Sequence, residues 1–130
     1  MRNQKLIASL EFITAAGLIL FWVAFFTAIV APENPPDCYF IFERSFPLPD
    51  LILAGGFIYS GVLLIKNRPD GKLFSLSCAG AILFLGILDF SFNIQNGMYL
   101  LSVFDLLVNA FINLWCILFG IFVIFSARIK

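Results

Sequence analysis

The sequence predicts an all-α integral membrane protein, a bundle of four transmembrane helices that forms one domain over residues 1–130. Of the 130 residues, 62% are hydrophobic and 12% are charged, and the mean hydropathy is +1.02. Soluble domains are normally about 45–50% apolar and about 25% charged. At about 20 residues per span, the apolar segments allow four helices.

The first predicted span covers residues 6–31 and ends at the proline-rich stretch 32–36. Its apolar run is too long for the core of a signal peptide, so we expect it to be retained. Glu11 lies about 8 Å from the start of this run, at 1.5 Å per residue. A carboxylate so close to the end of a span is expected to reach the membrane interface.

Residues 32–49 form the longest predicted loop, and their aromatic middle carries the charged pair Glu43 and Arg44. Aromatic side chains beside charges are typical of the membrane–water boundary, so we expect this loop to lie on the bilayer surface. The second predicted span covers residues 50–65. Its first residue, Asp50, has two open interpretations: an acid that complements the helix dipole, or a functional carboxylate.

The third predicted span covers residues 73–92, after a turn at residues 66–72 in which Pro69 presets φ and Gly71 permits a positive φ. At 100° per residue its polar and small side chains share one face: Ser75, Cys78, Ala79, Gly86, Asp89 and Asn93, with Ile82. Asp89 lies near the end of this helix, where a negative charge opposes the dipole, so the dipole does not explain it.

The fourth predicted span, residues 98–127, carries the most marked polar stripe. Between residues 102 and 120, nearly all polar or small side chains fall within an arc of about 80°: Ser102, Asp105, Asn109, Asn113, Cys116 and Gly120. Such a helix is expected to face lipid on one side and a polar partner on the other.

The basic residues predict the orientation. In a chain of four spans, all basic residues except Arg44 fall on one side: Arg2, Lys5, Lys66, Arg68, Lys72, Arg128 and Lys130. Arg44 lies on the opposite side, together with several acids. The positive-inside rule therefore predicts a cell-membrane protein whose N- and C-termini are both cytoplasmic.

This topology predicts a polar site near the outer leaflet. The second, third and fourth spans would bring their acids together there, under the loop that carries Glu43. The predicted ligand- or cation-binding residues are Glu43, Asp50, Asp89, Asn93, Asp105, Asn109 and Asn113. Carboxylates in an apolar site either share protons or bind a cation. The alternative is that they serve only as hydrogen-bonding contacts between helices.

Several kinds of chemistry find no support in the sequence. There is no histidine, and Cys38, Cys78 and Cys116 lack the C-x-x-C spacing of redox and zinc sites. No phosphate-binding loop, nucleophile motif or nucleic-acid footprint is present. We therefore expect no metal site, no cofactor and no nucleic-acid partner, and the sequence identifies no catalytic residue.

Three classes of function remain open. The favoured one is binding or transport of a cation or a small amphipathic ligand by a protein in the lipid bilayer. The second is a membrane enzyme doing acid–base chemistry, as an isomerase does, on a lipid or sterol-like substrate. The third is an accessory subunit of a larger membrane complex, and homo-oligomers are equally compatible with the composition.

Overall fold

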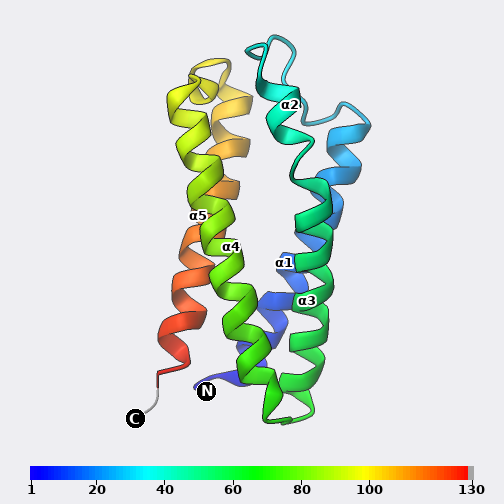
Figure 1. Cartoon of the computed structure of the whole chain (residues 1–130), viewed down its shortest axis with the longest axis vertical. Coiled ribbons are helices and arrows are strands. Elements are labelled where there is room, and N and C mark those ends of the chain that lie inside the picture. The colour runs from blue at the N-terminus through cyan, green and yellow to red at the C-terminus, as the bar shows by residue number, and fades with distance from the viewer. Residues whose placement is uncertain (129–130) are drawn as a thin grey trace.

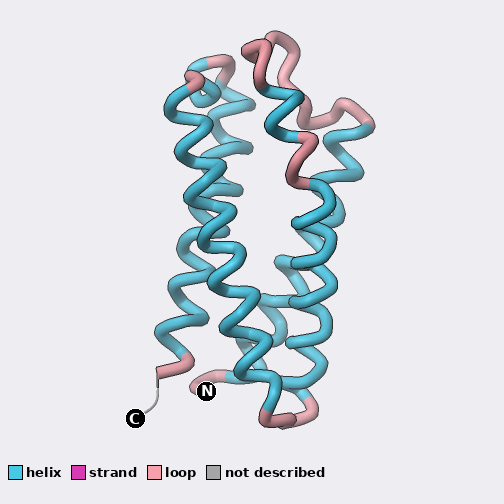
Figure 2. Tube along the Cα trace, viewed as in Figure 1, coloured by secondary structure: helices cyan, strands magenta, loops and turns pink. Residues whose placement is uncertain are grey.

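The structure is a computed structural model that describes residues 1–128, so Lys130 of the third basic cluster lies outside the described residues. The secondary-structure elements of the described residues are all helices, joined by loops (Figures 1 and 2): α1 Gln4–Phe26, α2 Tyr39–Glu43, α3 Pro47–Ile65, α4 Asp70–Gln95, the 3₁₀ turn η1 Met98–Leu100 and α5 Val103–Ser126. Over these residues, four helical stretches are long and apolar enough to cross a membrane: Gln4–Phe26, Tyr39–Ile65, Asp70–Gln95 and Val103–Ser126. The predicted all-helical chain with four long apolar helices is therefore confirmed.

The long helices associate as two pairs, α1 with α3 and α4 with α5, and the hairpin of α3 and α4 joins the pairs. Both described chain ends and the turn 66–69 lie at one end of the bundle, and α2 and η1 lie at the other (Figure 1). We call these the basic end and the α2 end. At the basic end lie Arg2, Lys5, Lys66, Arg68, Lys72 and Arg128.

The first helix ends at Phe26, earlier than the predicted Ala31. Ala28 has a φ of 61°, in the left-handed region. The amide of Ile29 donates to the carbonyl of Ala24 at 2.9 Å, and that of Ala28 donates to the carbonyl of Phe25 at 3.0 Å. These two bonds form a Schellman motif, which satisfies the last carbonyls and turns the chain out of the helix.

The turn between α3 and α4 uses a different residue from the one predicted. Asn67, with a φ of 53°, takes the left-handed conformation, and the Arg68 amide closes the turn on the Leu63 carbonyl at 2.9 Å. Asparagine tolerates this region better than most residues. Gly71 is instead a residue of the first turn of α4, where a Cβ would lie 3.0 Å from the Leu64 nitrogen. Its small size therefore serves packing, and the expectation of a positive φ at Gly71 is wrong.

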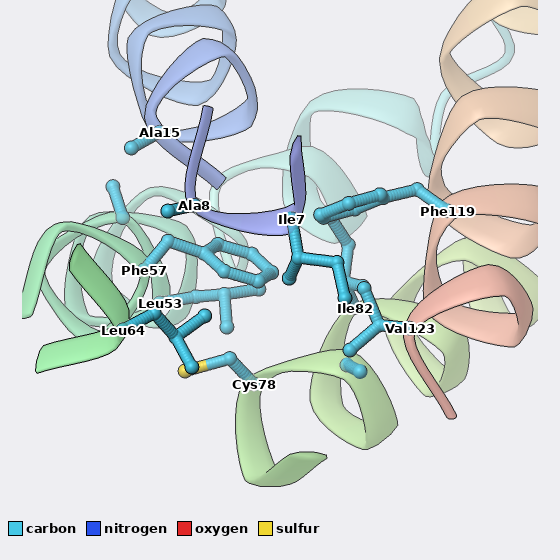
Figure 3. Close-up of a cluster of buried hydrophobic side chains, with 12 residues drawn as sticks. Ile7, Ala8, Ala15, Leu53, Phe57, Leu64, Cys78, Ile82, Phe119 and Val123 are labelled. Atoms are coloured by element: carbon cyan, nitrogen blue, oxygen red, sulfur yellow. The ribbon is translucent and has the colours of Figure 1, made fainter. Parts of the chain in front are cut away.

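The basic end contains a close-packed apolar core (Figure 3). Ile7 of α1 lies beside Phe119 and Val123 of α5, and all three are at most 5% exposed. Small residues lie where the helices contact each other: Ala8, Ala15, Ala54, Gly61, Gly71, Ala79 and Gly120. At Gly120 a Cβ would lie 2.8 Å from the Ala79 carbonyl oxygen, so α4 and α5 approach as closely as their backbones allow.

The α2 end is packed with large rings instead. Its core consists of Trp22, Phe25, Tyr39, Phe46 and Met98. Phe42 stacks on Phe92 of α4, with ring centroids 3.9 Å apart and planes 8° from parallel. The segment predicted as a surface loop thus contains a short helix. It packs onto the end of the bundle through Tyr39, Phe42 and Phe46, whereas Phe40 is exposed.

Candidate functional site

A cavity of about 270 Å³ lies in the half of the bundle toward the α2 end. Its walls come from α1, α4 and α5, and the segment from α2 to the start of α3 closes its end. The lining residues are Ile13, Thr14, Gly17, Leu18, Phe21, Trp22, Glu43, Phe46, Asp50, Ile82, Leu85, Gly86, Asp89, Asn109, Phe111, Ile112, Asn113, Trp115 and Cys116. The cavity is therefore mostly apolar and aromatic, with its acids gathered on α2, the start of α3 and the last turns of α4.

Three carboxylates face this cavity, and they are held very differently. Glu43 is 7% exposed, and across residues 1–128 no hydrogen bond reaches either of its oxygens. Asp50 is 9% exposed, and its Oδ2 accepts a hydrogen bond of 2.8 Å from Nε1 of Trp22. That bond joins α1 to α3 and fixes the Asp50 side chain at the end of the cavity.

Asp89 is held by a network between α4 and α5. Its Oδ2 accepts hydrogen bonds from Nδ2 of Asn113 at 2.6 Å and from Nδ2 of Asn93 at 3.3 Å. The Asn93 amide also donates to Oδ1 of Asn113 at 3.0 Å, and the Tyr99 hydroxyl donates to the same oxygen. Burial raises the pKa of the Tyr99 phenol, which therefore remains a donor at neutral pH.

The three carboxylates leave several acceptor atoms free. In the described part of the chain, no hydrogen bond reaches the two oxygens of Glu43, Oδ1 of Asp50 or Oδ1 of Asp89. No lysine or arginine lines the cavity. Arg44, which directly follows Glu43 in the sequence, is exposed and lies over the Phe40 ring, 5.9 Å from its centroid. Among the described residues, the side-chain atoms that are fully buried without a partner are Glu11 Oε2 and Asn93 Oδ1. The free oxygens of the three carboxylates are accessible instead, and a hydrogen-bond donor or a cation from outside the chain could reach them.

Five of the seven predicted site residues line the cavity: Glu43, Asp50, Asp89, Asn109 and Asn113. Asn93 lies behind the wall, 1% exposed, where it supports Asp89. Asp105 lies outside the lining. Its Oδ2 accepts a 2.7 Å hydrogen bond from the Ser102 hydroxyl, and its amide donates to that hydroxyl at 3.0 Å, so the pair caps the start of α5.

Several residues around the cavity were not predicted. Trp22 positions Asp50, Tyr99 completes the asparagine network, and Nε1 of Trp115 donates to the Thr14 hydroxyl at 3.0 Å, joining α5 to α1. Their residue types could have indicated such bonds, because an indole or phenol buried in an apolar segment normally finds a polar partner for its N–H or O–H.

Glu11 corrects another expectation. It is 0% exposed and does not reach the membrane interface. Its Oε1 accepts hydrogen bonds from the hydroxyls of Ser60 at 3.0 Å and Ser75 at 2.6 Å, while its Oε2 is buried without a partner. Glu11 thus joins α1, α3 and α4 at the basic end, away from the cavity.

The side chains around the cavity combine a few carboxylates with a large apolar surface. Within residues 1–128, no three His, Cys, Asp or Glu side chains come together in a group that could hold a metal. The walls, by contrast, present aromatic and aliphatic surface, as sites for organic ligands do. No protein-family model, no curated protein and no solved structure matches the chain.

Proposed function

We propose that this protein is a membrane-embedded binding protein for a small organic cation with an apolar body. The observation that carries the proposal is Glu43: a carboxylate more than nine-tenths buried, facing an apolar cavity, with no partner for either oxygen among residues 1–128. An ammonium group supplies both the positive charge and the N–H donors that such oxygens accept.

The cavity suits a ligand of this kind in size and shape. Its volume of about 270 Å³ equals the liquid volume of about nine water molecules, at about 30 Å³ each. Asp50 and Asp89 add two further carboxylates, and the aromatic residues Phe21, Trp22 and Trp115 also line the cavity. Aromatic faces attract cations, so the charge and the apolar body are both accommodated.

The membrane setting is part of the same proposal. The four apolar helices would span the bilayer with the basic end in the cytoplasm, because cytoplasmic segments carry the excess of lysine and arginine. The cavity would then lie in the outer half of the membrane.

Cys38 is exposed at the α2 end, whereas Cys78 is buried. An impermeant thiol reagent added outside intact cells should label Cys38, and labelling only after permeabilisation would contradict this orientation.

The test of binding uses a property of the chain itself. Its two tryptophans, Trp22 and Trp115, both line the cavity, so intrinsic fluorescence reports directly on occupancy. Cyclohexylamine, titrated into the protein in detergent or vesicles, should change this fluorescence in a saturable way. The uncharged analogue cyclohexanol should bind more weakly.

Glu43→Gln should weaken cyclohexylamine binding by about 10-fold or more, since a desolvated charge partner contributes above about 1.4 kcal/mol. The substitution breaks no intramolecular hydrogen bond, so stability should be retained. Glu33→Gln is the matched control, because Glu33 is exposed, precedes α2 and does not line the cavity. Equal affinity in Glu43→Gln, Glu33→Gln and the parent would exclude a charge-based site.

A further inference from the structure

The cavity reaches the surface of the bundle between α1 and α5. The lining residues at its α2 end, Glu43, Phe46 and Asp50, are at most 9% exposed. Ile13 of α1 and Phe111 of α5, which also line it, are 57% and 67% exposed. The exposed part of the lining is thus on the sides of these two helices, and the end is closed.

Gly17 lies at this opening. It lines the cavity and is exposed, and a Cβ at this position would meet no atom within 4 Å. The glycines between α4 and α5 differ: at Gly86 a Cβ would lie 2.7 Å from Cys116 Cβ. Gly17 therefore leaves the wall of the cavity open, whereas Gly86 allows two helices to touch.

The opening lies far from both ends of the apolar helices. At 1.5 Å per residue, Gly17 is about 20 Å along α1 from Gln4. The hydrocarbon core of a bilayer is about 30 Å thick. With the four helices inserted, the opening faces lipid tails rather than water.

We infer that the ligand is a single-tailed amine dissolved in the membrane, which enters sideways between α1 and α5. This inference rests on the proposed function. The ammonium group binds at Glu43, in the cavity that Asp50 and Asp89 also line, and the hydrocarbon tail extends past Gly17 toward the lipid. From Trp22, which holds Asp50, to Thr14 at the other side of the lining, α1 runs about 12 Å, so a tail that starts near Asp50 has a largely apolar wall to lie along.

The experiment compares octylamine, which has a tail, with cyclohexylamine, which has none, by tryptophan fluorescence in vesicles of zwitterionic lipid. Gly17→Phe fills the opening with a ring, yet lies about 8 Å along α1 from Trp22. It should weaken octylamine binding by about 10-fold or more, because the tail methylenes lose their buried path. Cyclohexylamine has no tail that must pass Gly17, so its binding should weaken clearly less than that of octylamine, and the ratio of the two affinities is the measured quantity.

Gly80→Phe is the matched control. Gly80 is exposed on α4, does not line the cavity, and also has no atom within 4 Å of its would-be Cβ. Each variant is compared with the parent for the same amine, so the stronger partitioning of octylamine into lipid cancels. If Gly17→Phe fails to fold, Gly17→Leu takes its place and should weaken octylamine binding to an intermediate degree.

The outcomes separate the two proposals. Loss of octylamine affinity in Gly17→Phe alone supports sideways entry of a tailed amine. Equal octylamine affinity in Gly17→Phe and Gly80→Phe overturns it, as does a parent that binds cyclohexylamine but not octylamine. In both of these cases the proposed function survives. A parent that binds neither amine overturns the proposed function and this inference together.

Discussion

The two ends of the bundle both bury acidic side chains, and they do so in opposite ways. At the basic end, Oε1 of Glu11 accepts two serine hydrogen bonds and Oε2 is enclosed without a partner, both within a close-packed core. At the α2 end, Glu43, Asp50 and Asp89 face a cavity of about 270 Å³ with oxygens left free. A buried acid in an apolar helix is therefore not by itself a binding residue: its surroundings decide whether it joins helices or meets a ligand.

The size of the neighbouring side chains explains the difference. Alanine and glycine occupy the helix contacts at the basic end, so backbones approach closely and exclude space for a ligand. Tryptophan and phenylalanine occupy the corresponding levels toward the α2 end. The basic end also contains the rings of Phe57 and Phe119, but there the rings pack against each other, with centroids 5.6 Å apart. Toward the α2 end, Phe21, Trp22 and Trp115 line a cavity instead.

The largest predicted effect on stability belongs to Glu11→Ala. The substitution leaves a cavity in a close-packed core and removes the acceptor of Ser60 and Ser75, so the free energy of unfolding should fall by about 3 kcal/mol. Unfolding in detergent, followed by circular dichroism, measures this. Glu33→Ala, at an exposed position, should leave stability unchanged.

Glu11→Gln sharpens the same comparison. Glutamine keeps one acceptor oxygen for the two serines, so the free energy of unfolding should fall by no more than about 1 kcal/mol. Its amine affinity should equal that of the parent, because Glu11 does not line the cavity. An alanine variant as stable as the parent would show that the acid at the basic end does not hold the helices together.

Alanine substitutions at two glycines test the contrast in packing. At Gly120 a Cβ would lie 2.8 Å from a backbone carbonyl oxygen, which cannot move without shifting a helix, so Gly120→Ala should destabilise by about 1–3 kcal/mol. At Gly17 the new methyl group meets open space, and alanine is the better helix former by about 0.5–1 kcal/mol. Thermal melts of the two variants should therefore move in opposite directions, and equal shifts would contradict the assigned packing.

The smallest predicted effect is that of Asp105→Asn. Asparagine still offers an oxygen to the Ser102 hydroxyl, so the start of α5 should lose no more than about 0.5 kcal/mol. The affinity for cyclohexylamine should stay within about 2-fold of the parent, in contrast to Glu43→Gln. A 10-fold loss of affinity in fluorescence titrations would return Asp105 to the binding site.

Periodicity in the sequence was sufficient to predict the helices and their inward faces. On α4, Ser75, Cys78, Ala79, Ile82, Gly86 and Asn93 are all buried, as their shared face predicts, and Asp89 lines the cavity. Antiparallel topology was sufficient to predict that Asp50, Asp89 and Glu43 would lie toward the same end of the bundle, where all three line one cavity. These properties follow from spacing along a helix and from the order of helices, both of which are contained in one sequence.

Partners on other helices and the positions of helix ends were harder to predict. The fourth span was expected to begin at Met98, which places Asp105 two turns inside a helix. Because α5 begins at Val103, Asp105 falls in its first turn and caps it. Ser102, three residues before Asp105, is a typical residue for the position that caps a helix start, and it could have indicated that α5 begins at Val103. Nothing in the sequence near Glu11 indicated that hydroxyls from α3 and α4 would reach it, since the rotation of one helix against another depends on the packing of the whole bundle.

The connection between α1 and α3 is much longer than two antiparallel neighbours require, since about 2–8 residues commonly join such helices. Here residues 27–46 make the connection, and they carry α2, Glu43 and the ring that stacks on Phe92. The cover of the cavity is thus encoded in a connecting segment rather than in the bundle. If the proposed function holds, substitutions in that segment should change ligand preference without any repacking of the four long helices, so stability and ligand preference would vary separately in this architecture.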